Sequence, residues 1–547
     1  MIKRLFNSQS KTVTFAAIII GISALISRFL GLIRDRLLAG TFGASQELDV
    51  YFAAFRIPDF VYGILIMGGV TAVFLPVFTQ YLKKSEEDGW LFTSNVLNCF
   101  LILLISLCGI LAVFTPWLIK FITPGFTGEQ KDLAISLTRI MFLSPIFLGL
   151  SSVFSGILHY FSRFLAYSLA PIFYNLGLII GILFFLPILG VWGLAYGVAL
   201  GAFLHLLIQI PAAKLCGFKY SFAFNFKYPG LLKMFKLMIP RTIGTAAYHL
   251  NLIVVTAVGS TLTVGSIAVF NFANNLQGFP MGIIGISFAL ASFPALSRAW
   301  VNGQKEEFLS SFSSVLRQAL FLLIPASFLI FLLRAQIVRL VLGTGEFGWL
   351  ETRLTAASLG IFCFGVFAAA LIPFLARAFY SFHNTKTPVS AGLAAMALNI
   401  ILAFLFVWLL SFENFFQALI INFLKVKDIE DVRVLGLSLA LAVAGVFQFS
   451  LLLFFLHKKI GHIRLKEVRS SLWKILTASL AMVFTAYLAL QAAAGFLSLN
   501  TFLGLFFQTA LAGFFGFFVY LVIARLLKLP EIKTIKSSVF SQFSRKK

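Results

Sequence analysis

The sequence predicts an all-α polytopic membrane protein with about fourteen transmembrane helices. Hydrophobic residues make up 60% of the 547 residues and charged residues only 11%, which is too little charge for the surface of a soluble protein of this length. Apolar stretches of about 18 residues or more recur along the whole chain, and each is long enough to cross a bilayer as a helix.

The apolar stretches are separated by proline, glycine and clusters of charge, which divide the chain into successive predicted spans. The first span has no small-residue cleavage site before its arginines, so we expect a retained helix and not a signal peptide. Several spans exceed the roughly 20 residues that a bilayer needs and are expected to tilt or to protrude into water. The predicted spans are 13–40, 48–81, 90–121, 131–157, 166–187, 190–213, 233–261, 266–298, 308–341, 353–381, 387–411, 434–457, 470–494 and 500–526.

Basic residues gather in every second connection between these spans and at both termini. The other connections are nearly uncharged or balanced, as in 425–433. Because positively charged loops stay on the cytoplasmic side, we expect an even number of spans with both termini cytoplasmic. The formal net charge of +24 then reflects orientation and not nucleic-acid binding, since no soluble segment gathers this charge with interleaved aromatic residues. One of these connections carries Lys214, Lys219, Lys227, Lys233 and Lys236, and another carries Lys458, Lys459, Arg464, Lys466 and Arg469.

A weak internal repeat predicts the domain organisation. Residues 50–74 can be laid without gaps on residues 269–293, which places Phe60 on Phe279. The offset corresponds to six spans, so we expect two pseudo-symmetric six-helix lobes, 1–220 and 221–465, followed by a helix pair and a basic tail in 466–547. Paired lobes around a central site are how many transporters alternate access.

Charged residues inside the first two predicted spans are the candidate functional residues, because each costs about 3 kcal/mol or more at mid-membrane. Arg28 and Asp35 are seven residues apart and share a helix face, as do Asp49 and Arg56. Arginine binds phosphate oxygens in bidentate fashion, so these residues predict a cationic cleft for a phosphorylated substrate. An alternative for Arg34 and its neighbours is that they end the first helix at the interface, but this leaves Arg28 unexplained.

The sequence lacks the motifs that would indicate ATP hydrolysis, nucleophilic catalysis or a metal site. It contains no GxxxxGK[ST] phosphate loop, its histidines are spread over unrelated positions, and its four cysteines have no paired spacing. We therefore expect a transporter and not an enzyme, with no cofactor and no metal site.

Several short segments of the chain form a signature. The specific part lies in 27–35, 41–44 and 52–58, and weaker segments follow in 74–78, 293–297, 377–380 and 385–388. In these segments the chain resembles the MurJ (MviN) lipid II flippase family. The resemblance implies a fourteen-helix member of the multidrug/oligosaccharidyl-lipid/polysaccharide exporter superfamily. Such proteins move the undecaprenyl-diphosphate-linked peptidoglycan precursor from the cytoplasmic to the outer leaflet of the bacterial inner membrane. The headgroup enters a central cationic cavity, and the lipid tail follows a groove of the last two helices.

The resemblance also assigns individual residues and shows departures. Arg28 and Arg34 match the family's first-helix arginines, and Asp49 matches its acidic position on the second helix. The family's second-helix arginine and glutamate are Tyr62 and Met67 here, its Asp-Arg pair on the eighth helix reads Asn274-Asn275, and the aspartate often seen before Thr-x-Thr-Pro is Asn384. Arg241 either replaces a lost charge or is an ordinary cytoplasmic anchor.

The leading hypothesis is a monomeric lipid II flippase that works by alternating access and is driven by a membrane potential or an ion gradient. Arg28 and Arg34 would engage the diphosphate, and Asp35 and Asp49 would orient the arginines. The remaining predicted site residues are Arg56, Arg241, Asn274, Asn275 and Gln277, the amides serving as neutral donors to sugar or peptide. The alternatives are an exporter of another polyprenyl-linked oligosaccharide and a membrane glycosyltransferase or ligase. The interfacial helix expected in 411–433 argues against the enzyme.

Overall fold

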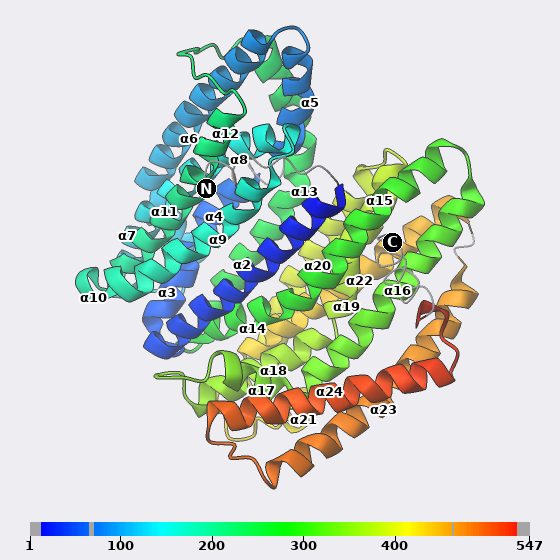
Figure 1. Ribbon diagram of the computed structural model, residues 1–547. Helices are drawn as coiled ribbons and strands as arrows, with labels where there is room; N and C mark the ends of the chain where they lie inside the picture. The colour runs from blue at the N-terminus through cyan, green and yellow to red at the C-terminus, as the bar shows by residue number, and fades with distance from the viewer. Residues whose placement is uncertain (1–12, 65–69, 462–463, 533–547) are drawn as a thin grey trace. The chain divides into compact units, whose positions relative to one another are not determined.

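The computed structural model describes residues 13–64, 70–461 and 464–532, and these residues form helices and no strand (Figure 1). Contacts group the chain into two compact units. The first unit is Met1–Ala268 with Gly345–Phe347, and the second is Val269–Thr344 with Gly348–Lys547. The predicted boundaries at 220 and 465 follow from the sequence repeat and remain a prediction.

The first unit is built from α2 to α13. α13 packs against α4, α5 and α6 of this unit, and α2 packs along α9. The bounds are α2 Val13–Phe42, α3 Gln46–Ala54, α4 Arg56–Tyr62, α5 Thr71–Leu82, α6 Glu86–Ile122, α7 Gly128–Met141, α8 Leu143–Tyr160, α9 Phe164–Ile180, the π-helix η2 Gly181–Phe185, α10 Leu186–Leu189, α11 Trp192–Leu207, α12 Gln209–Leu215 and α13 Pro229–Gly259.

The second unit contains most of α14 and all of the helices that follow it. In this unit α23 pairs with α24 and also packs on α16 (Figure 1). The bounds are α14 Ser266–Pro280, the π-helix η3 Met281–Gly285, α15 Ile286–Val301, α16 Lys305–Leu332, α17 Arg334–Val341, α18 Trp349–Cys363, α19 Val366–Ser381, α20 Lys386–Leu409, α21 Phe415–Leu424, α22 Val434–Ile460, α23 Leu465–Ala494 and α24 Phe502–Leu526.

The protein is a multi-pass membrane protein. Among the residues described, ten helices are long and apolar enough to cross a bilayer, or eleven if α18 and α19, bent by 47°, form one span. The predicted spans 13–40, 48–81 and 233–261 fall on α2, on α3 to α5 and on α13, which this count does not include. The all-helical membrane fold is thus confirmed, while the number fourteen remains a prediction.

Side-chain caps explain where several helices begin. The hydroxyl of Ser85 accepts from the backbone N–H of Asp88 at 3.0 Å, and acidic residues fill the first turn of α6, where they oppose the helix dipole favourably. Asn414 caps α21 by accepting from Gln417 N–H at 2.8 Å. The helix expected within 411–433 is therefore present, and its start is set by this asparagine.

Close helix packing in the first unit depends on glycine. A Cβ on Gly177 or Gly181 of α9 and η2 would collide with the backbone of Gly201 or Gly197 on α11. Small residues at facing positions let two transmembrane helices approach with their backbones in contact, which is a common way to hold helices together in lipid.

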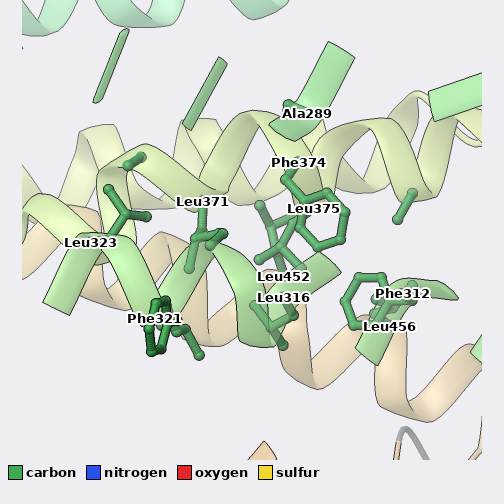
Figure 2. Packing of buried hydrophobic residues seen from close by; sticks show 14 of the residues in the cluster. Ala289, Phe312, Leu316, Phe321, Leu323, Leu371, Phe374, Leu375, Leu452 and Leu456 are labelled. Atoms are coloured by element: carbon green, nitrogen blue, oxygen red, sulfur yellow. The ribbon is translucent and has the colours of Figure 1, made fainter. Parts of the chain in front are cut away.

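The second unit has an aromatic and aliphatic core. Figure 2 shows Phe312 and Leu316 of α16 with Phe374 of α19 and Leu452 of α22, and all four are buried. The rings of Phe312 and Phe374 stack with their centroids 5.0 Å apart. Beside this core, Glu531 in the segment after α24 accepts from Ser471 of α23 at 2.7 Å and lies 3.6 Å from Arg317 of α16. These contacts attach the helix pair to α16.

Candidate functional site

The first two arginines of the predicted site lie on α2. Arg34 donates from Nε and Nη2 to Oδ1 of Asp35 at 3.0 and 2.7 Å, and its side chain is 21% exposed while that of Asp35 is 5% exposed. Arg28 lies almost two turns earlier on the same helix and is half-buried. Asp35 thus forms an ion pair with Arg34, and that it orients this arginine for a substrate stays a prediction.

Arg56 is buried at the first residue of α4. Its Nε donates to the hydroxyl of Thr256 on α13 at 2.6 Å, so it connects two helices of the first unit. Asp59, one turn further along α4, interacts electrostatically with both Arg56 and Arg34. Asp59 therefore places negative charge near the arginines of both helices, and the sequence prediction did not include it among the site residues.

Four tyrosines complete the surroundings of these charges. Tyr51 and Tyr174 interact electrostatically with Arg34 and Asp59, Tyr248 with Arg56 and Asp59, and Tyr62 with Asp59. We call this group the polar cluster; it consists of Arg34, Asp35, Tyr51, Arg56, Asp59, Tyr62, Tyr174 and Tyr248. It combines charged groups with phenol hydroxyls, which are the donor types that a phosphate or a sugar binds.

Sequence reasoning singled out Tyr62 only as a departure from the family pattern and did not include any of the four tyrosines among the site residues, because tyrosines look like ordinary positions in an aromatic-rich chain. Asp59 had a usable signal, since it follows Arg56 by three residues and therefore faces the same side of a helix. Tyr174 and Tyr248 had none, because they reach the cluster from α9 and α13, far away in the sequence.

Asp49 makes a different set of contacts. Its buried carboxylate accepts from the backbone N–H groups of Gly265 and Ala268, both at 2.7 Å. These groups lie at the start of α14, where unpaired backbone donors and the helix dipole favour a carboxylate. Through these hydrogen bonds Asp49 stabilises the start of α14, independently of any contact with a substrate.

The predicted amide donors lie on α14 in the second unit. Gln277 donates from Nε2 to Oδ1 of Asn274 at 2.8 Å; Gln277 is buried, Asn274 half-buried and Asn275 exposed. Their role in binding stays a prediction. The side chain of Arg241 and the whole of Met67 lie outside the described residues. Within the described ranges, no three His, Cys, Asp or Glu side chains gather where they could hold a metal ion.

The second unit contains an apolar cavity of about 520 Å³. Its walls come from α16, the bend between α18 and α19, α21, α22 and α23, and the lining is almost entirely leucine, isoleucine, valine and phenylalanine. Ser327 is the hydroxyl-bearing residue in this lining, and its hydroxyl donates to the carbonyl of Leu323 at 2.9 Å, within its own helix. Such a cavity suits a hydrocarbon and offers nothing to a charged group.

Residues 38–508 match the protein family described as lipid II flippase MurJ. The chain belongs to this family. It is 31% identical over 493 residues to a probable lipid II flippase MurJ of Buchnera aphidicola subsp. Schizaphis graminum, which covers 84% of this chain and 93% of the relative. It is also 31% identical over 412 residues to a probable lipid II flippase MurJ of Vibrio cholerae serotype O1, covering 73% and 78%. The resemblance found in the sequence is confirmed.

Solved structures agree with this assignment. A structure titled lipid II flippase MurJ, inward closed conformation, matches 94% of this chain and 100% of its own, with a TM-score of 0.75 and 26% identity. An inward-facing multidrug transporter of the MATE family matches 82% of this chain and 99% of its own, with a TM-score of 0.63. At 14% identity the second likeness shows a shared fold only. The chain is thus a member of a transporter family, as predicted.

Tyr62 and Asn275 are two positions at which the chain departs from the MurJ pattern that it resembles, and the surroundings of these two residues differ. Tyr62 is half-buried and packs near Leu148 and Ala202, with its hydroxyl group in the polar cluster. Asn275 is exposed. Position 62, where the resemblance implies an arginine in the family, thus carries a neutral phenol in this chain.

Proposed function

We propose that this chain is a lipid II flippase, which moves undecaprenyl-diphosphate-linked peptidoglycan precursor from the cytoplasmic to the outer leaflet of the bacterial inner membrane by alternating access. Membership of the MurJ family, matched over residues 38–508, supports the substrate. The observation that carries the proposal is the polar cluster, in which the Arg34–Asp35 ion pair and the buried Arg56 lie inside a membrane protein whose family is named for a lipid diphosphate.

The diphosphate binds at Arg28 and Arg34. Within the polar cluster two arginines face two carboxylates, so the cluster itself carries no excess formal charge. Arg28, half-buried on the same helix as Arg34, supplies the additional positive charge that an anion requires. When the diphosphate arrives it competes with Asp35 for the guanidinium of Arg34, and the tyrosine hydroxyls donate to the remaining oxygens.

Part of the polyprenyl chain occupies the apolar cavity of the second unit. Its lining contains Leu465, Val468, Leu472 and Leu476 of α23, the first helix of the C-terminal pair. A volume of about 520 Å³ is within the range of about 300–1,000 Å³ for small-ligand sites, so the cavity holds a few isoprene units and not the whole chain.

The transport cycle follows from the same proposal. Nothing in the sequence binds ATP, so a membrane potential or an ion gradient drives the protein. The monomer is the working unit, both termini are cytoplasmic, and the amides Asn274, Asn275 and Gln277 donate to the sugar or the peptide of the headgroup.

A second candidate function is export of another polyprenyl-linked oligosaccharide, favoured by the neutral Tyr62 and Asn275 at positions where the resembling family carries arginine. The test uses the purified chain in proteoliposomes loaded with lipid II or with an undecaprenyl-diphosphate oligosaccharide that lacks the peptide. Faster translocation of lipid II supports the proposal. Translocation of the oligosaccharide alone would replace it with the second candidate.

A further inference from the structure

The connection between α12 and α13 runs beside α6 without regular secondary structure, and aromatic residues occupy every second position of 220–226. Their side chains are exposed, Tyr220 by 58%, Phe222 by 88%, Phe224 by 47% and Phe226 by 43%, and the hydroxyl of Tyr220 donates to Oδ1 of Asn98 on α6 at 2.9 Å. Between them, Ser221 and Ala223 are half-buried and Asn225 is exposed. We call residues 219–227 the aromatic strap.

Side chains of α6 hold the backbone of the strap. Asn225 donates its N–H to Oδ1 of Asn95 at 2.6 Å, and Nδ2 of Asn95 donates back to the carbonyl of Asn225 at 3.0 Å. Asn98 donates to the carbonyl of Ala223 at 2.8 Å. Because helix side chains pair with its polar backbone groups, the strap does not need a strand partner or full exposure to water.

Aromatic contacts hold the two ends of the strap. Phe218, just before it, packs edge-on against Trp90 and Phe154 with centroids 5.7 and 5.6 Å apart. Tyr228, just after it, packs against Tyr81 with centroids 5.4 Å apart. The rings at both ends are therefore half-buried, whereas the four rings between them are exposed. The contacts at the two ends fix which rings are exposed.

The strap and the residues that flank it in sequence carry positive charge only, while the start of α6 carries Glu86, Glu87 and Asp88, of which Asp88 interacts electrostatically with Tyr228. Residues 214–236 contain five lysines and no acidic residue, and Lys219 and Lys227 bracket the outward rings. Asn95, which holds the strap, lies about 10 Å, or seven residues at 1.5 Å each, before Ile102 on α6. α6 exposes Leu91 near its start and, from Ile102 on, further apolar residues such as Ile105. Aromatic rings with lysine beside the start of a lipid-facing surface are typical of the headgroup region.

We propose that the aromatic strap is an interfacial anchor that binds the anionic cytoplasmic surface of the bilayer. The four rings enter the boundary between headgroups and acyl chains, and the lysines pair with lipid phosphates. The anchor goes beyond transport of the substrate, because it contacts the bulk lipid from outside the polar cluster and the apolar cavity. It holds the connection between α12 and α13 at a fixed depth.

The test places a spin label at Phe222→Cys in the full chain with its four native cysteines replaced, reconstituted in phosphatidylglycerol-containing vesicles. Glu87→Cys, exposed at the start of α6, reports water, and Ile105→Cys reports lipid. The ratio of oxygen to nickel-chelate accessibility at 222 should exceed that at 87 by about threefold, because interfacial aromatic positions exclude the polar reagent. A ratio equal to that at 87 places the strap in water and overturns the proposal.

A second measurement separates the bilayer from a protein partner. Lys219→Gln/Lys227→Gln should lower the accessibility ratio at 222 in anionic vesicles, whereas Lys427→Gln, an exposed lysine outside the strap, should not. A label shielded from both reagents would show that another copy of the chain covers the strap, which contradicts a lipid anchor. If the cysteine-free chain does not fold, brominated phosphatidylglycerol can be used with Phe222→Trp in the natural chain, where the quenching of the added fluorescence is obtained by subtracting the signal of the natural chain and its seven tryptophans. Lipid II translocation is assayed separately, so failure of the anchor and failure of the flippase are distinguishable.

Discussion

Arg56 donates a hydrogen bond of 2.6 Å to the hydroxyl of Thr256, which lies two hundred residues later in the chain. The bond joins α4 to α13 within the first unit, and both side chains are buried. It holds the guanidinium of Arg56 in place. The charge of this guanidinium acts on Asp59, and the charge of Arg34 acts on the same carboxylate. The order of the polar cluster therefore depends on a threonine that carries no charge.

Thr256→Val is expected to weaken the cluster. It removes the hydroxyl with little change of volume and leaves a buried donor of Arg56 without this acceptor, which costs about 2 kcal/mol for a hydrogen bond to a charged group. We expect a lower thermal unfolding midpoint in detergent and slower lipid II translocation. Thr256→Ser keeps the hydroxyl and is the matched control. Equal behaviour of the valine and serine variants would show that the bond does not matter.

Arg56 and Asp59 are expected to be strongly non-additive. Arg56→Gln or Asp59→Asn alone leaves the other charge, which is buried for Arg56 and half-buried for Asp59, without its nearby counterpart and should destabilise the protein by about 1–3 kcal/mol. The double variant removes both charges, so its destabilisation should be well below the sum of the two single values. A double-mutant cycle on the free energy of unfolding measures this. Additive single effects would mean that the two residues act independently.

Asp49 allows a test between a structural and a substrate-binding role. Asp49→Ala removes the acceptor for two backbone N–H groups at the start of α14 and should cost about 1–2 kcal/mol, as the loss of a helix cap does. Hydrogen exchange at 265–268 should rise in this variant. If instead stability and exchange are unchanged while translocation is lost, Asp49 acts on the substrate and the cap is incidental.

The apolar cavity is expected to be sensitive to added bulk. Ser327→Trp places a large ring among its walls and should slow translocation of lipid II by about tenfold, which corresponds to about 1.4 kcal/mol. Ser390→Trp makes the same change at an exposed position of α20 and should leave the rate near its natural value. If the two variants translocate lipid II at the same rate, the polyprenyl chain does not use this cavity.

The helices and the family could be read from the sequence because their signals are local. Apolar runs set the spans, and the opening signature around Arg28 and Arg34 lies within a single stretch. The helix expected in 411–433 is present as α21, where Asn414 supplies a local cap. A break such as the π-helix after Pro280 was not predicted, since its position depends on how α14 and α15 pack.

The partners within the site could not be read in the same way. Thr256, Tyr174 and Tyr248 reach the polar cluster from helices far away in the sequence, and their residue types are common in apolar spans. The register of the aromatic strap depends on Asn95 and Asn98 of α6, which the loop sequence does not reveal. Contacts of this kind are set by tertiary packing, and a periodicity argument does not contain them.

The most direct test of the central claim is complementation of a flippase-depleted bacterium, with lipid II in the outer leaflet measured directly, by the natural chain and by Arg28→Ala/Arg34→Ala. The account predicts that the natural chain restores outer-leaflet lipid II and that the double variant, expressed at the same level, does not, because it lacks the two arginines that bind the diphosphate. Restoration by the double variant would contradict binding of the diphosphate at these arginines. Failure of a well-expressed natural chain would contradict the assignment of lipid II as the substrate.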